Sequence, residues 1–211
     1  MKKTMILLIL AVMGQFAFAQ DESYNNDEIR TIFSKNQSNG AYGAITFGYS
    51  QIDGKDAFVT GARGAFIVDH KFAVGIGGYG FVNDFDYKEI VAGNPVNVGL
   101  AGGYGGIFIE PIVGSRLPIH LSFPVLMGVG GVALVEESGW WDNYYYDRYD
   151  SESDVYLVFE PAVEVELNLA KVFRVAAYGS YRYTSDIELS GTSPDALKGW
   201  NMGLTFKLGK F

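Results

Sequence analysis

The sequence predicts an all-β fold, an eight-stranded antiparallel up-and-down transmembrane β-barrel. Three observations support this prediction. Apolar side chains alternate with small or polar ones in eight successive segments, the small-residue faces of these segments carry few charges, and the chain begins with the pattern of a secretion signal. A period of two residues is typical of a β-strand with one apolar face, and a closed barrel leaves no strand edge unpaired.

The clearest of these segments is residues 198–211, KGWNMGLTFKLGKF. Its apolar side chains occupy every second position, at Trp200, Met202, Leu204, Phe206 and Leu208. The same pattern predicts the other strands at 40–50, 57–68, 72–82, 96–109, 119–135, 155–168 and 172–183.

The alternation also predicts which side chains face lipid. On the strand 96–109 we expect Leu100, Tyr104 and Phe108 outside, with the intervening glycine and alanine residues inside. Pro124 and Pro161 fall within expected strands, where proline removes a ladder hydrogen bond, so we expect bulges or strand ends there.

The links between the strands alternate in length. Short links are expected at 69–71, 110–118 and 169–171, and longer polar links at 83–95, 136–154 and 184–198. Short turns on one rim and long loops on the other are the usual asymmetry of outer-membrane barrels. The long loops are therefore expected to face the outside of the cell.

The first 19 residues have the pattern of a cleaved signal peptide. Lys2 and Lys3 precede a short apolar run, and Ala17 and Ala19 offer small residues before the expected cleavage site. The run is about half the ~20 residues that a membrane-spanning helix needs. Residues 20–38 are then a polar periplasmic leader, either disordered or a short helix capped by Asn26, and residues 39–211 form the barrel.

Composition excludes several classes of function. The chain has no cysteine, which excludes disulfides, thiol catalysis and lipoprotein anchoring. Without Lys2 and Lys3 the mature chain has 14 basic residues against 24 acidic ones, a net charge of about −10. Such a chain is poorly suited to nucleic acid, whose affinity comes from phosphate neutralisation. No cofactor is predicted.

Alternation alone does not separate a membrane barrel from a soluble, lipocalin-like cup, but the charges do. The faces opposite the apolar side chains carry too few charges for a solvated surface and nearly equal numbers of each sign. They are suited to a narrow lumen in which charges pair with one another. These charges lie at Arg63, Glu160, Glu164, Glu166, Arg174, Arg182 and Lys207.

Aromatic side chains form two bands, as expected at the two membrane interfaces. The outer band comprises Tyr49, Phe58, Tyr181, Tyr183 and Trp200. The inner band comprises Phe66, Phe72, Phe108 and Phe173.

With its signal peptide, eight alternating strands, tight DHK and LAK turns and terminal LTFKLGKF, the chain resembles the small outer-membrane β-barrel proteins of Gram-negative bacteria, the OmpA/OmpX type. The resemblance covers about residues 39–211 and implies a barrel without a peptidoglycan-binding domain. It transfers no functional residue, because fold does not fix function. Expected partners are outer-membrane lipid, lipopolysaccharide, and the barrel-assembly machinery during insertion.

Two motifs suggest chemistry. Residues 75–80, GIGGYG, match the dinucleotide fingerprint by letter, but no helix pattern follows them, so glycines that thin a strand are the better interpretation. His120 and Ser122 share one strand face, as in barrel-type lipid A deacylases. A lipid A-modifying hydrolase is therefore an alternative function, although this pair is expected at the inner end of its strand.

The link 136–154 is the strongest candidate for a binding surface. It holds seven acidic residues against one basic residue, and Tyr and Trp are common anchors of binding surfaces. Its close carboxylates suit Ca²⁺, but EF-hand spacing is absent, so no metal site is predicted, and weak divalent-ion binding to neighbouring lipopolysaccharide stays an alternative. We therefore predict a non-enzymatic barrel that is structural or binds an external ligand or surface, with a narrow transport pore as a second alternative. The candidate binding residues are Trp140, Trp141, Asp142, Tyr144, Tyr145, Tyr146, Asp147, Tyr149 and Asp150.

Overall fold

The computed structural model describes residues 39–83, 87–91, 94–136 and 152–211. In this part of the chain all regular structure is β-strand, and no helix is long and apolar enough to cross a membrane. The strands are β1 Gly40–Ile52, β2 Lys55–Val68, β3 Phe72–Asn83, β4 Tyr87–Val91, β5 Asn94–Val113, β6 Ile119–Ser122, β7 Val125–Glu136, β8 Ser153–Ala170, β9 Phe173–Thr184 and β10 Gly199–Lys210.

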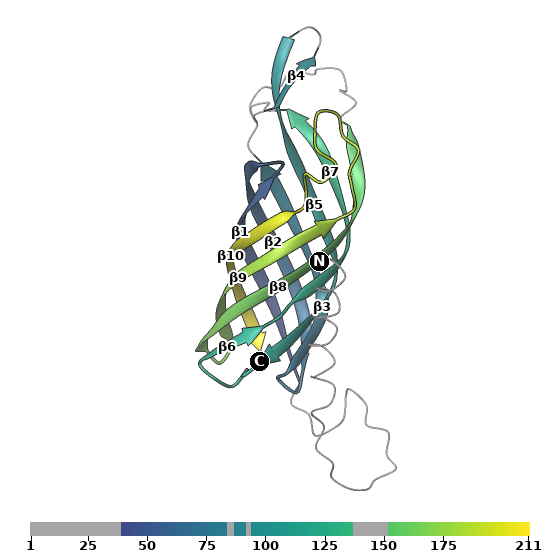
Figure 1. Cartoon of the computed structure of the whole chain (residues 1–211). Helices are drawn as coiled ribbons and strands as arrows, with labels where there is room; N and C mark the ends of the chain where they lie inside the picture. The colour runs from purple at the N-terminus through teal and green to yellow at the C-terminus, as the bar shows by residue number, and fades with distance from the viewer. Residues whose placement is uncertain (1–38, 84–86, 92–93, 137–151) are drawn as a thin grey trace, which may run out of the picture. The chain divides into compact units, whose positions relative to one another are not determined.

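These strands close into an antiparallel barrel with eight strand positions around the ring (Figure 1). Neighbouring positions in the ring follow one another along the chain, and β3 pairs directly with β5. β6 and β7 share one position, between β5 and β8. The ring closes where β10 pairs with β1, with Phe206 opposite Ile45. The predicted eight-stranded up-and-down barrel is confirmed, and most strand ends lie within two residues of their predicted positions.

The tightest turns follow from local backbone chemistry. Asp53 and Gly54 join β1 to β2, and both have positive φ angles, as a two-residue hairpin turn with right-handed twist requires. Asp69 and His70 do the same between β2 and β3, at φ angles of 51° and 56°. The amide of Lys71 closes this second turn on the carbonyl of Val68 at 3.1 Å.

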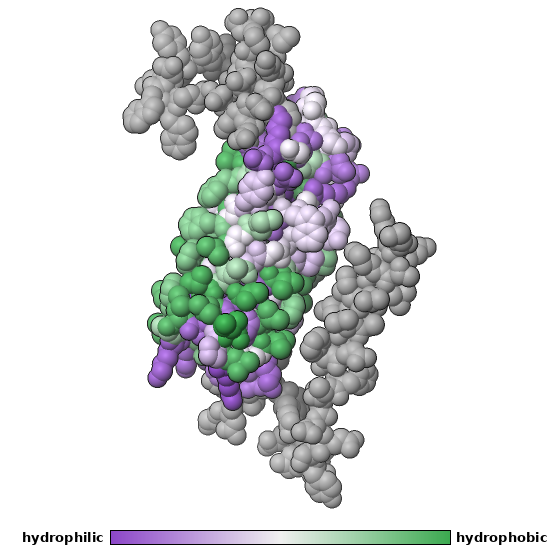
Figure 2. Space-filling model, turned by 60° about the vertical axis from the view of Figure 1, so that its left-hand side comes forward, coloured by the Kyte–Doolittle hydropathy of each residue, from purple (hydrophilic) through white to green (hydrophobic). Residues whose placement is uncertain are grey.

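The outer wall of the barrel is apolar, as predicted. Leu204 and Val165, which would line the cavity of a soluble cup, are 46% and 49% exposed on the outside. On the face shown in Figure 2, apolar side chains form a belt between polar side chains at the two ends. A wall of exposed leucine, valine, isoleucine and phenylalanine is what hydrocarbon requires of a spanning barrel.

The predicted orientation of one strand is wrong. On β5 the large side chains Leu100, Tyr104 and Phe108 are buried in the lumen, and the glycine-rich face lies outside. Phe108 therefore does not belong to the inner aromatic band. The reason is Glu110, which the sequence analysis assigned to a link: β5 continues to Val113, and Glu110 shares the inward face of Phe108 and is fully buried. A charge that must avoid lipid sets the phase of the strand.

The link 83–95, expected as a long polar link, contains a strand. Residues 87–91 form β4, which pairs with residues 94–98 at the start of β5, so a hairpin extends beyond the barrel ring (Figure 1).

Pro124 interrupts the strand that lies between β5 and β8 and divides it into β6 and β7. The two parts keep the same register against β8. Pro161 stays within β8, where the ladder to β9 skips positions 160 and 161. The interruption near Pro124 is one of the predicted outcomes, but neither proline produces a register shift.

Candidate functional site

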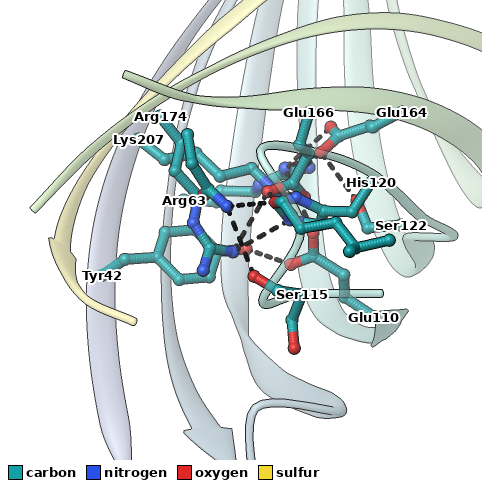
Figure 3. Close-up of polar contacts among 12 residues, drawn as sticks. Tyr42, Arg63, Glu110, Ser115, His120, Ser122, Glu164, Glu166, Arg174 and Lys207 are labelled. Carbon is teal, nitrogen blue, oxygen red and sulfur yellow. Dashed lines mark hydrogen bonds and ion pairs between the residues drawn. The ribbon is translucent and has the colours of Figure 1, made fainter. Parts of the chain in front are cut away.

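The lower lumen, on the side of the C-terminus, contains a closed network of charges (Figure 3). At its centre the ammonium of Lys207, on β10, lies 2.5 Å from Glu110, 2.7 Å from Glu164 and 2.6 Å from Glu166. The three carboxylates come from β5 and β8, so the ammonium links β10 to both of these strands across the lumen. All four side chains are buried, with exposures of 2% or less.

Two guanidinium groups complete the network. Arg63 contacts both oxygens of Glu164 at 2.7 Å, and Arg174 contacts Glu166 at 3.3 Å. Three buried acids thus face three buried bases. Such a balance is needed, because a buried charge left without a partner costs several kcal/mol.

Aromatic rings line the same network. The hydroxyl of Tyr42 donates to Glu110, and the guanidinium of Arg63 lies 5.4 Å from the ring centroid of Phe108. Phe211 stacks on Tyr42 and covers the guanidinium of Arg174 at 3.8 Å. The last residue of the chain therefore packs at the inner end of the network.

The oxygens of Glu110, Glu164 and Glu166 lie within 4.8 Å of one another, a spacing that suits a metal ion. The ammonium of Lys207, however, contacts all three. It provides the positive charge that a cation would otherwise supply.

The structure separates Glu160 and Arg182, the other two predicted lumen charges, from this network. Glu160 accepts hydrogen bonds from Ser180 at 2.5 Å and from Asn201 at 2.6 Å. Arg182 donates through Nε to the carbonyl of Leu197 at 2.7 Å. Although β8–β9 register places Glu160 opposite Arg182, the two form no ion pair.

His120 and Ser122 lie within the charge network. The ring of His120 is 3.0 Å from Glu166, and the hydroxyl of Ser122 donates to Glu164 at 3.2 Å. No acid lies close to this pair in the sequence, and the β6–β8 pairing places Glu166 opposite His120 and Glu164 opposite Ser122. Both residues are buried at the inner end of the barrel, where they face the other lumen side chains rather than the outer leaflet.

The lumen between the two groups of charges holds little space. An enclosed cavity of about 20 Å³ lies among Thr46, Arg63, Glu160, Glu164 and Thr205. That volume suits about one water molecule. The described lumen is therefore filled by side chains, as expected for eight strands.

The upper lumen is covered by residues 185–198, here called the outer strap. Ile187, Leu189 and Leu197 of the strap are buried in the same apolar cluster as side chains of the barrel wall. The strap is anchored at one end by the amide of Asp53, which donates to Ala196 at 2.9 Å. The expected outer loop 184–198 is thus folded into the barrel mouth rather than extended from it.

The edge of the strap is held to the start of β8. The backbone amide and hydroxyl of Ser190 donate to Glu152 at 2.7 and 2.8 Å. These hydrogen bonds hold the pKa of Glu152 below its ordinary value. The amide of Glu188 donates to Asp154 at 2.7 Å.

The predicted binding residues of the link 136–154 lie outside the described residues, as do the expected signal peptide and leader at 1–38. These candidates are Trp140, Trp141, Asp142, Tyr144, Tyr145, Tyr146, Asp147, Tyr149 and Asp150.

Comparison with known proteins gives a likeness in structure only. No protein-family model and no curated protein sequence matches the chain. Among solved structures, Neisserial surface protein A (NspA) matches over 84% of this chain and 100% of its own, with a TM-score of 0.55 and 6% identity. The fold is that of a small outer-membrane β-barrel.

Ail, the attachment invasion locus protein of Yersinia pestis, matches this chain more distantly. Its structure covers 82% of this chain and 98% of its own, with a TM-score of 0.39 and 12% identity. The structure of Ail in complex with the heparin analogue sucrose octasulfate matches over 81% of this chain and 99% of its own, with a TM-score of 0.43 and 15% identity.

Proposed function

We propose that the protein is a sealed, non-enzymatic outer-membrane barrel that binds a partner at the cell surface through its outer links. The observation that carries this proposal is the filled lumen: a charge network occupies its inner half and the outer strap its outer half. A pore needs an open path and a lipid hydrolase needs an accessible nucleophile, and neither fits this interior. The outer links are the surface that can meet a macromolecular partner outside the cell.

The charge of those links suggests the chemistry of the partner. Residues 53–56, 84–95, 136–154 and 184–198 together carry fifteen acidic and four basic side chains. The inner links 69–71, 114–118 and 171–172 carry one acidic and three basic side chains. An acidic outer surface steers and orients a basic partner. We infer that this partner is a basic protein surface.

The aromatic residues of the link 136–154 supply the anchors in this proposal. Its six tryptophan and tyrosine side chains combine apolar area with a polar tip, which is the usual composition of a binding hot spot. Residues 1–19 act in the same scheme as a cleaved signal that delivers the chain to the periplasm before insertion.

Adhesion of intact cells tests the proposal. Cells that display the protein are expected to adhere to a surface coated with a basic protein, such as lysozyme, and not to one coated with serum albumin. Replacing Trp140, Trp141, Tyr144, Tyr145, Tyr146 and Tyr149 with serine should reduce adhesion at least ~10-fold, the effect of losing one or two hot-spot anchors.

Two controls separate this function from its alternatives. His120→Ala should retain adhesion, and the wild-type protein should give no conductance steps in a planar bilayer. Equal adhesion to both coatings would contradict the binding proposal. Steady conductance would instead favour a pore, and loss of lipid A modification in His120→Ala would favour a hydrolase.

A further inference from the structure

The upper lumen is a cup with an apolar wall. Its lining includes Ile52, Phe81, Leu100, Leu134 and Val158, each exposed by 6% or less. The residues that fill the cup belong to a loop rather than to the wall: Ile187, Leu189 and Leu197 of the outer strap. An apolar space occupied by a loop can exchange that loop for another apolar occupant, whereas a space filled by strand side chains cannot.

Two hydrogen bonds hold the buried part of the strap among the described residues, one from the amide of Asp53 to Ala196 and one from Arg182 to the carbonyl of Leu197. The contacts with β8 lie at the exposed rim, where Ser185 exchanges two hydrogen bonds with Leu157 and the strap also bonds to Glu152 and Asp154. Inside the cup the strap is thus docked mainly by apolar burial, which a competing apolar molecule can replace.

Arg182 lies beside the strap and over the rings of Phe81 and Tyr104, and it is fully buried, yet it has no carboxylate partner among the described residues. Its Nη1 has no hydrogen-bond acceptor, and its Nη2 reaches only the hydroxyl of Ser50 at 3.5 Å. Glu160, opposite on β8, is instead held by Ser180 and Asn201. The guanidinium groups of Arg63 and Arg174 in the lower lumen each contact a carboxylate, so Arg182 differs from them in having no anionic partner among the described residues.

A buried guanidinium without an anion is costly, and a carboxylate at Nη1 would remove that cost. We propose that the upper lumen is a binding site for a small anionic amphiphile, such as a medium-chain carboxylate. The molecule enters from the outer face and displaces the strap. Its apolar chain takes the place of Ile187, Leu189 and Leu197, and its carboxylate binds Arg182.

The test uses the full-length protein in lipid nanodiscs, with decanoate as the probe and decanol and decylamine as matched controls. Binding is measured by ligand-observed NMR, with empty nanodiscs subtracted. Decanoate should bind more tightly than either control. Arg182→Gln should weaken decanoate binding ~10-fold or more, as expected for a charged hydrogen bond, and leave decanol unchanged.

The strap supplies a second, matched pair of variants. Ile187→Ser removes a buried strap contact and should tighten decanoate binding ~10-fold, because less apolar burial opposes displacement. Glu188→Ser changes the adjacent exposed side chain and should leave binding unchanged.

A readout on the wild-type protein avoids any failure of a variant to fold. Decanoate should speed hydrogen exchange of the Asp53 amide, which bonds to the strap. Equal binding of all three probes would show lipid partitioning only and overturn the proposal. So would preferential binding of decylamine, or decanoate binding that leaves the Asp53 amide protected.

Discussion

The two halves of the lumen fill the same cylinder in different ways. In the inner half, side chains fixed on strands form a network of three acids and three bases around Lys207. In the outer half, the wall is apolar and a single loop, the outer strap, packs into it. Ion pairs between strands hold the inner half together, whereas a loop that can separate from the wall closes the outer half.

The difference indicates how each half responds to change. Removal of one member of a buried charge network leaves its partners uncompensated, and the damage spreads to every strand that supplied them. Removal of an apolar contact from the strap weakens only the docking of that loop, because the barrel ladders beneath it remain paired. The inner half should therefore control global stability, and the outer half local opening.

The largest expected effect is that of Lys207→Met. This change removes the ammonium that contacts Glu110, Glu164 and Glu166, and leaves three carboxylates close together. Breaking a buried charge network in this way typically costs about 3–5 kcal/mol. Urea unfolding in lipid vesicles, followed by tryptophan fluorescence, measures the loss.

Lys210→Met is the matched control, because Lys210 lies on the same strand and is exposed. Its effect should stay within about 0.5 kcal/mol of wild type, as for most surface substitutions. If the two variants unfold at the same urea concentration, the network is not the main determinant of stability.

A smaller and more local effect is expected for Leu197→Ala in the strap. Leu197 is fully buried in the apolar cup, and truncation of a buried leucine costs about 2–5 kcal/mol. The cost should appear as strap opening, measured by exchange of the Asp53 amide, which should speed roughly 30-fold or more.

Amides of β1 and β10 near Lys207 should exchange at wild-type rates in Leu197→Ala, and Glu188→Ala should leave the Asp53 amide unchanged. Faster exchange throughout the barrel would mean that the two halves unfold as one unit, which would remove the distinction drawn between them.

The same contrast explains what the sequence predicts well. Strand positions and the lipid-facing side follow from alternation over many residues, because hydrocarbon accepts no misplaced polar group. Arg63, Glu164, Glu166, Arg174 and Lys207 interrupt apolar patterns, so they identify the inner face of their strands directly.

The errors occur where alternation has no unique interpretation. On β5, glycine alternates with large residues, and either face can be turned to lipid until Glu110 is counted as part of the strand. Extending the pattern by that one residue would have shown both the orientation and the missing acid of the network.

The strap was beyond prediction for a different reason. Residues 185–198 are mostly polar, and only Ile187, Leu189, Ala196 and Leu197 become buried. Four apolar residues in a polar segment indicate no period, and their destination depends on the shape of a barrel mouth built by other strands. The separation of Glu160 from Arg182 likewise depends on the strap, whose Leu197 carbonyl takes the Nε–H of Arg182.

The smallest expected effect is a dependence of strap docking on pH. Hydrogen bonds from Ser190 hold the pKa of Glu152 below its ordinary value of 4.5 in the folded strap. A depressed pKa means that the contact is fully formed above pH 4.5 and is lost as the pH falls through the lower, folded value. The Ser190 amide resonance should therefore shift as the pH falls below 4.5, followed by NMR in nanodiscs.

Glu152→Gln should abolish this shift, while Glu188→Gln, which alters the neighbouring exposed carboxylate, should retain it. The effect is small because Glu152 is fully exposed to solvent, where water competes for both partners and salt screens the charge. A Ser190 resonance that does not move would show that the strap edge is not held by Glu152.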